Sequence, residues 1–132
     1  KILAGWITML ACKNFTEEEL ACKGTGCCNG ENKCQDELVE KLQQLRDEVG
    51  FPISISSGYR CEVHNRVVGG HPSSSHMEGL AIDALCSGQR ALDLVAAAIP
   101  IFEGVGISQK SKSHNKRFVH LDIKPGKRMW SY

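Results

Sequence analysis

A single acidic residue inside a strongly apolar segment constrains this chain most. Residues 80–85 form a short apolar run of the kind that makes a buried β-strand, and Asp83 lies inside it. A lone carboxylate is costly to bury, so the fold must bring it a partner. His76 lies seven residues earlier, and His120 lies in a second apolar run. Each residue alone is typical of an ordinary surface or core-edge position, but the three together suit a divalent metal.

The periodicity of the other segments predicts an α+β domain. Residues 36–49 carry apolar side chains on one helical face, and Thr16 and Glu19 form a capping box that begins a shorter helix. Further helices are expected at 61–67 and 89–98, and strands at 53–56, 80–85, 104–107 and 118–123. Because helices come first and strands follow, we expect a small antiparallel sheet with flanking helices.

The size and charge of the chain exclude several classes of protein. Its 132 residues suit one domain, on which we expect the N-terminal extension, residues 1–13, to pack. The formal net charge is +1, from 16 Lys and Arg against 15 Asp and Glu, so no basic excess points to nucleic acid. No apolar run reaches the roughly 20 residues that span a bilayer. We therefore expect a monomer with no nucleic-acid partner and no membrane span.

Seven cysteines in a chain of this length are typical of an oxidising compartment. We expect a disulfide-stapled domain, with one unpaired cysteine that could bridge to a partner chain. A bridge between Cys61 and Cys86 is feasible if the strands that precede them are neighbours. The alternative is a structural zinc site of four cysteines, although their spacing fits paired zinc knuckles poorly. Its members would be Cys22, Cys27, Cys28 and Cys34.

Several motifs in a fixed order resemble the zinc peptidases of the M15 type, which include D-Ala-D-Ala carboxypeptidases and peptidoglycan endopeptidases. The resemblance extends from about Phe15 to Tyr132. It rests on Ser57-Gly58-Tyr59-Arg60, Asn65, Val68-Gly69-Gly70, Ser75-His76 with Gly79, Ala81 and Asp83, His120-x-Asp122, and Arg128-x-Trp130-Ser131-Tyr132. It implies a Zn²⁺ cofactor held by His76, Asp83 and His120, and a fold related to the amino-terminal domain of hedgehog proteins.

A zinc hydrolase also needs a base for the attacking water, and three residues are candidates. Asp122 is the first candidate. It lies two residues after His120 on a predicted strand, so both side chains project from the same face of the sheet. Its alternative role is to orient the His120 ring through a hydrogen bond. His114, in a polar loop, is the second candidate, and Glu103 is the third. Several relatives carry an acidic residue three positions before the last zinc ligand, where this chain has Arg117, and others carry a histidine two positions before it, where this chain has Phe118.

In the peptidases that this chain resembles, the arginine matching Arg60 lines the site, so the resemblance implies that Arg60 stabilises the substrate or the developing oxyanion. A guanidinium suits a carboxylate, with which it forms two hydrogen bonds; the alternative is a salt bridge to a surface acid. The resemblance implies a secreted zinc hydrolase that cuts peptide bonds in bacterial peptidoglycan peptides, next to a D-amino acid. The alternative is a catalytically inactive binding or signalling module that keeps zinc, as hedgehog-like domains do. Arg117 favours this alternative, because it replaces an acidic residue that relatives use as the base.

Overall fold

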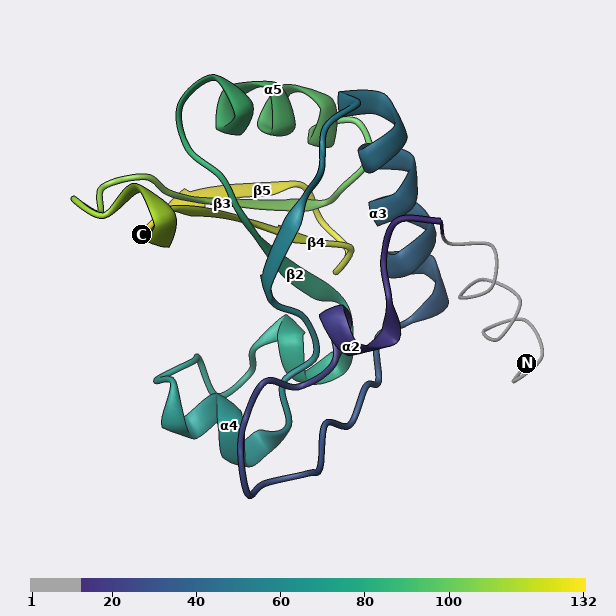
Figure 1. Ribbon diagram of the computed structural model, residues 1–132, viewed down its shortest axis with the longest axis vertical. Helices are drawn as coiled ribbons and strands as arrows, with labels where there is room; N and C mark the ends of the chain where they lie inside the picture. Colours follow the sequence, from purple (N-terminus) through teal and green to yellow (C-terminus); the bar gives the residue numbers. More distant parts are fainter. Residues whose placement is uncertain (1–12) are drawn as a thin grey trace.

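The computed structural model of the protein describes residues 13–132, and its elements confirm the α+β class (Figure 1). The predicted N-terminal extension, apart from its last residue, lies outside the described residues. The helices are α2 (Glu17–Leu20), α3 (Asp36–Val49), α4 (Glu62–Val67) and α5 (Gly88–Ala98), with 3₁₀ turns η1 (Ser75–Glu78) and η2 (His114–Lys116). The strands are β1 (Ser54–Ser57), β2 (Ala81–Leu85), β3 (Gly104–Ser108), β4 (Phe118–Asp122) and β5 (Arg128–Ser131).

The five strands form one sheet in the order β1-β2-β4-β3-β5. The prediction of an antiparallel sheet is wrong at one edge, because β3 and β5 pair in parallel, whereas β1–β2, β2–β4 and β3–β4 are antiparallel. The connection after β4 reverses the chain and carries it past β3 to the far edge. Since β3 already runs opposite to β4, a strand that follows this reversal runs in the same direction as β3.

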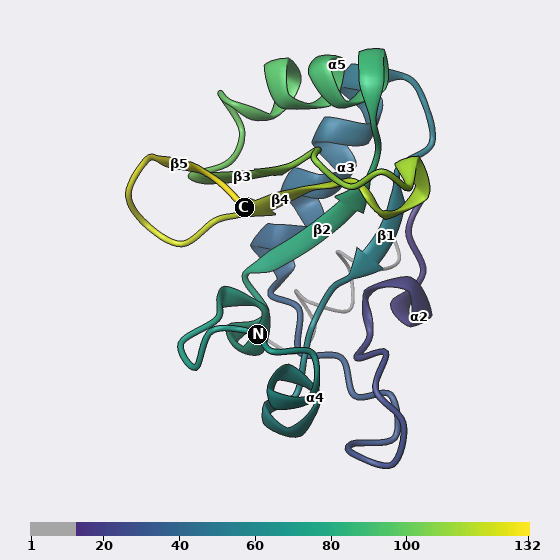
Figure 2. The same cartoon turned by 90° about the vertical axis from the view of Figure 1, so that its left-hand side faces the viewer.

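The two faces of the sheet have different neighbours. Side chains alternate along a strand, so Ile82 and Ala84 of β2 face the core with Val119 and Leu121 of β4. Helices α3 and α5 cover this face, and Figure 2 views the sheet with α3 behind it. Asp83 alternates to the other face, which these helices leave uncovered. The burial of one face therefore fixes which residues the opposite face presents.

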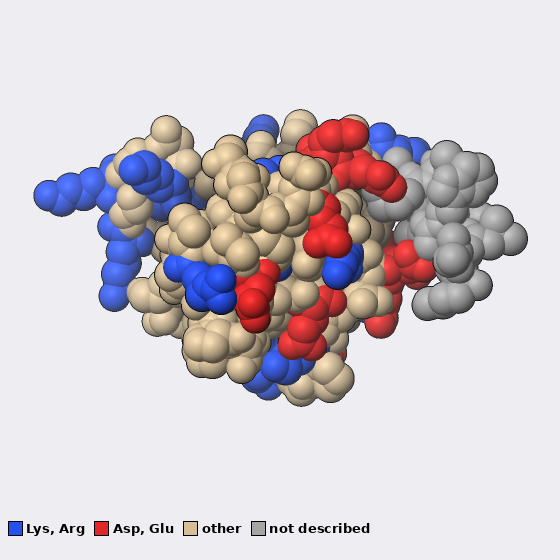
Figure 3. Space-filling view, turned by 90° about the horizontal axis from the view of Figure 1, so that it is seen from below, with Lys and Arg blue, Asp and Glu red and all other residues tan. Residues whose placement is uncertain are grey.

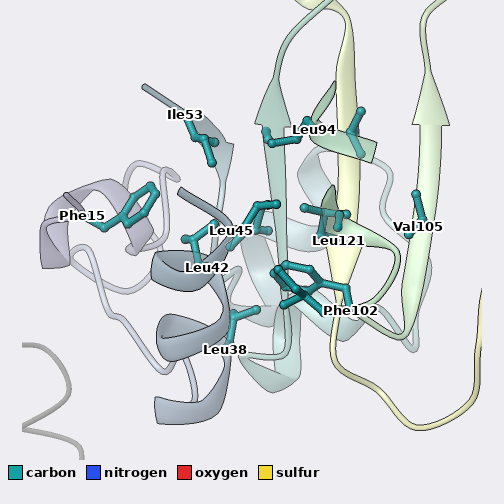
Figure 4. Close-up of a cluster of buried hydrophobic side chains, with 14 of the residues drawn as sticks. Phe15, Leu38, Leu42, Leu45, Ile53, Leu94, Phe102, Val105 and Leu121 are labelled. Carbon is teal, nitrogen blue, oxygen red and sulfur yellow. The ribbon is translucent and has the colours of Figure 1, made fainter. Parts of the chain in front are cut away.

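Helix α3 supplies the largest part of the core on the covered face. Leu38, Leu42 and Leu45 are fully buried and point toward Phe102 and Leu121 in Figure 4. The helix ends at Gly50, whose φ of 74° closes the last turn in a conformation that glycine adopts at little cost. Each fully buried leucine contributes about 1.5–3 kcal/mol relative to an exposed one, so this stripe anchors the helix to the sheet.

The short helix α2 is joined to the end of β1. Its predicted capping box is confirmed, because the Thr16 side chain accepts from Glu19 N while the Glu19 side chain accepts from Thr16 N. Tyr59 N donates to Leu20 O at 2.9 Å. A Cβ on Gly58 would clash with the Leu20 carbonyl, so a residue without a side chain is needed at this crossing. Figure 3 views this end of the molecule, whose surface carries both acidic and basic side chains.

The prediction of a disulfide-stapled domain is not confirmed, since the six cysteines from Cys22 onward are all free thiols in the described residues. The proposed Cys61–Cys86 bridge fails for a topological reason. Strands β1 and β2 are neighbours, but they are antiparallel, with Ser54 opposite Leu85 and Ser57 opposite Asp83. Cys86 therefore lies near the start of β1 and Cys61 beyond its end. Within residues 13–132, no helix combines the length and apolar character needed to cross a membrane.

Candidate metal centre

One row of residues across the uncovered face of the sheet carries the predicted metal ligands. In the strand register Asp83 of β2 lies opposite His120 of β4, which lies opposite Gly106 of β3 and then Trp130 of β5. Pairing therefore places Asp83 and His120 side by side although 37 residues separate them. His76 reaches the same point from η1, which packs against β2. The structure brings the three predicted ligands together.

The donor atoms of these three residues converge on one point. Asp83 Oδ1 lies 3.2 Å from His76 Nε2 and 3.1 Å from His120 Nδ1. One ligand atom from each residue lies within 4.8 Å of the other two. Both imidazoles are buried, while the Asp83 side chain keeps 13% of its surface exposed. Two nitrogens and one carboxylate oxygen, with one side open, are the donor set of a catalytic zinc site.

Each imidazole is oriented by a partner on its far side. His76 Nδ1 donates to Gly58 O at 2.8 Å, and His120 Nε2 donates to Asp122 Oδ2 at 2.9 Å. With those nitrogens protonated, a neutral ring presents a lone pair toward Asp83. Three acceptor atoms then face one another, and a cation satisfies all of them. Such far-side partners are typical of metal-binding histidines, so the residues present fit a metal ion.

The charges of the cluster shift the pKa values of its members. When the two rings instead carry protons on the nitrogens that face Asp83, burial raises the pKa of Asp83, but hydrogen bonds donated by His120 and His76 outweigh it and hold that pKa well below its usual range. Burial lowers the pKa of His120, but Asp122 and Asp83 raise it further, and the net shift is upward. For Asp122, burial raises the pKa while pairing with His120 and Arg128 lowers it to about 2. Both carboxylates are therefore ionised at neutral pH.

Asp122 lies behind His120 rather than in front of it. Its side chain is fully buried, and Arg128 Nη2 donates to Oδ1 at 2.7 Å while Lys124 N donates to the same oxygen at 3.1 Å. Gly104 lies between Asp122 and Arg128 in the register, and a Cβ there would overlap the Asp122 carboxylate. With both oxygens engaged, this geometry favours the orienting role of Asp122 over that of a proton acceptor.

Arg60 lies beside the cluster with part of its guanidinium unpaired. Its Nη1 donates to Asn65 Oδ1 at 3.0 Å, but within the described part of the chain its buried Nε has no hydrogen-bond partner. Burial lowers the pKa of Arg60, and Asp83 partly opposes this shift. A buried N–H without a partner is costly, but Arg60 as a whole lines the cleft, where its positive charge faces a bound molecule. Arg60 N also donates to His76 O at 3.1 Å, which joins it to the ligand segment.

The cluster opens into a cleft of about 680 Å³. Trp130 and Tyr132 line it with Arg60, and the Trp130 ring centre lies 5.0 Å from that of His120. A Cβ on Gly106 would meet the Trp130 ring at 2.7 Å, so this glycine makes room for the indole. His64 and His71 also line the cleft.

The other two candidate bases lie away from the cleft. His114 is exposed on η2 and is not among the described residues that line the cleft. Glu103 precedes β3, where its carboxylate accepts from Gly126 N at 3.2 Å and pairs with Lys127 at 3.7 Å. Neither residue is brought to the ligand cluster. A loop residue such as His114 has no periodicity that would have shown its direction.

These features define an α+β protein with a cleft whose floor can hold a divalent cation. The sequence profile of the Peptidase M15 family matches residues 13–122. This match covers most of the chain and contains all three candidate ligands, so the protein belongs to the Peptidase M15 family. Membership supports peptidase activity and implies a peptide as the substrate. No curated protein matches the chain.

Proposed function

We propose that this protein is a zinc-dependent peptidase that cleaves peptide bonds in bacterial cell-wall peptides, next to a D-amino acid. The observation that carries the proposal is the convergence of His76, Asp83 and His120 at the floor of an open cleft. Two imidazoles and one carboxylate suit zinc, with a fourth position left toward the cleft. A cell-wall substrate lies outside the cytoplasm, so the proposal includes secretion of the protein. It also includes action as a monomer.

The residues around the cluster take separate roles in this proposal. Zinc, when bound, supplies a Lewis acid that activates water and polarises the scissile carbonyl. Gly58 O and Asp122 hold the two imidazoles in the tautomer that can bind it. Arg60, which lines the cleft, binds a substrate carboxylate or the developing oxyanion. Trp130 and Tyr132 form an aromatic wall against which the peptide packs.

Asp122 remains the proposed base only if it can leave its present contacts. Its carboxylate accepts from His120 Nε2, Lys124 N and both terminal nitrogens of Arg128. A base must reach the proton that it takes within about 2.6–3.2 Å or through one water. We therefore assign Asp122 the role of positioning His120. Which residue accepts the proton of the attacking water is tested separately with variants of Asp122 and His114.

The experiment is turnover of purified peptidoglycan and of a synthetic cell-wall peptide ending in D-amino acids. The purified protein is assayed as isolated, after removal of metal by a chelator, and after zinc is added back. Loss of turnover on chelation and its recovery with zinc are expected, and His76→Ala should stay inactive under all three conditions. A matched His114→Ala variant should behave as the wild type. Full activity in the chelator would remove the metal from the mechanism.

A second candidate function is a zinc-containing binding module of hedgehog-like fold without catalysis. Two observations favour it: the acidic residues lining the cleft within the described chain are Asp83 and Asp122, and both are already engaged. Arg117 stands where relatives have an acidic residue, and its Nε donates to Ser111 O at 2.7 Å. This position therefore supplies no carboxylate that could act as the base. Zinc-dependent binding of the cell-wall peptide with no turnover would support this module over the peptidase.

A further inference from the structure

Four cysteines converge at a second point, at the end of the molecule that holds α2 and α4. The Sγ atoms of Cys22, Cys27, Cys28 and Cys61 all lie within 4.8 Å of one another. Cys22 and Cys61 are 3.8 Å apart at their sulfurs, and Cys27 and Cys28 are 3.9 Å apart. A tetrahedron with zinc–sulfur bonds of about 2.3 Å has sulfur–sulfur edges of about 3.8 Å. These two sulfur–sulfur distances therefore match the edges of a tetrahedral site, and the 4.8 Å bound keeps the four sulfurs close enough to share one ion.

We propose that these four cysteines bind a second, structural zinc ion. Four thiolates are the ligand set that closed, tetrahedral structural zinc sites use, with no position left for substrate. Cys22 and Cys61 are buried and Cys27 and Cys28 are half-buried, so the site is shielded from solvent on one side. Tyr59 packs against the same group of cysteines, and His64 N donates to Cys61 Sγ at 3.4 Å.

The loop that carries three of these cysteines needs such a crosslink. Residues 21–35 contain no helix or strand and connect α2 to α3. Loops of this length without regular structure are uncommon in compact domains unless something holds them. A Cβ on Gly24 would meet Cys27 Sγ at 2.7 Å and the His64 ring at 2.8 Å, so the loop approaches α4 closely. A metal bound to Cys61 and to this loop would fasten the two segments together.

The membership of the site differs from the four cysteines that the sequence analysis considered. Cys34 lies outside the cluster and its thiol donates to Leu20 O at 3.6 Å. Cys61 replaces it, because β1 returns to α2 and delivers the residue that begins α4 to the loop. The spacing among residues 22–34 alone could not reveal a ligand that comes from 33 positions after Cys28.

A metal at the four-cysteine site would also stabilise the geometry of the His76, Asp83 and His120 cluster. Cys61 directly follows Arg60, whose backbone N donates to His76 O, and it lies three residues after Gly58, whose carbonyl orients the His76 ring. A metal bound to Cys61 would therefore fix the segment that follows β1. This segment positions the candidate ligand His76 and contains the candidate anion-binding residue Arg60. This role needs no contact with the substrate.

Zinc stoichiometry and ligand type test the proposal without relying on activity. Protein purified under reducing conditions should contain two equivalents of zinc, and His76→Ala should keep one. In cobalt-substituted His76→Ala, thiolate-to-cobalt charge-transfer absorption should be present, and the zinc form should show X-ray absorption shells of sulfur at about 2.3 Å. Cys28→Ser should lose one equivalent, whereas Cys86→Ser, outside the cluster, should keep two.

Three results would overturn the proposal. The first is one equivalent of zinc in the wild type together with none in His76→Ala. The second is a cobalt form of His76→Ala without thiolate absorption. The third is the finding, by mass spectrometry of unreduced protein alkylated after denaturation, that the four cysteines are paired as disulfides. The measurements on His76→Ala keep the test decisive even if Cys28→Ser does not fold.

Discussion

The replacement Asp122→Asn separates the two roles available to this buried carboxylate. In the wild type the Asp122 side chain is fully buried, holds His120 Nε2 at 2.9 Å and pairs with Arg128 at 2.7 Å. The amide keeps the shape but loses the charge that holds the His120 ring in its metal-binding tautomer. Losing such a partner lowers metal affinity by about 10- to 100-fold, equivalent to about 1.4–2.7 kcal/mol.

The variant should also be less stable than the wild type. Arg128 loses its ionised partner, but its side chain is 38% exposed and can turn to water, so the cost is about 1–3 kcal/mol rather than that of a fully buried pair. Because the pKa of Asp122 in the fold is about 2, this contribution is present above the usual pKa of an aspartate and disappears as the pH falls through about 2. The difference in the free energy of unfolding between Asp122→Asn and the wild type should therefore shrink as the pH falls toward about 2.

Zinc affinity, measured by competition with a chromophoric chelator, and turnover at saturating zinc should be compared in Asp122→Asn. The matched control is Asp93→Asn, an exposed aspartate on α5, which should leave both quantities unchanged. If Asp122 only positions His120, affinity falls and turnover at saturating zinc is largely retained. Unchanged affinity with a fall in kcat of about 10²- to 10⁴-fold would refute this reasoning and restore Asp122 as the base.

Three further predictions follow from the same geometry. Arg60→Lys should keep its zinc while kcat/KM falls at least about tenfold, because an ammonium cannot reproduce the planar, two-point hydrogen bonding of a guanidinium; equal turnover in both proteins would contradict this. His114→Ala should change zinc content and turnover by less than about twofold, since His114 lies outside the cleft; an inactive variant that retains zinc would make it the base. Leu42→Ala should lower the free energy of unfolding by about 2–5 kcal/mol, against little change for exposed Leu92→Ala; urea denaturation that shows no difference between them would contradict the core assignment.

The parts of the site that strand alternation and local patterns control were predictable from the sequence. Asp83 stands out because an apolar strand has no other use for a charge, and the helical stripe over residues 36–49 identifies the helix that covers the opposite face. His120 and Asp122 were expected on one face of a strand, and the structure places both there. Each of these inferences needs only the two-residue period of a strand or the 3.6-residue period of a helix.

The parts that depend on how distant segments pair were not predictable. The contact between Asp122 and Arg128 requires β5 to lie beside β3, a parallel pairing that no local pattern indicates. The same pairing brings Trp130 to His120. Cys61 joins the cysteines of a distant loop because β1 ends beside α2. Side chains on irregular segments, such as His71 and His114, have no period from which their direction could be derived.

The central claim, that His76, Asp83 and His120 together bind one zinc ion at the floor of the cleft, is tested most directly by anomalous scattering at the zinc edge from crystals of the purified protein. The claim predicts a peak at about 2.0–2.2 Å from His76 Nε2, His120 Nδ1 and an Asp83 carboxylate oxygen, with its fourth side open to the cleft. The absence of any peak among these three atoms, in crystals grown with zinc present, would contradict it.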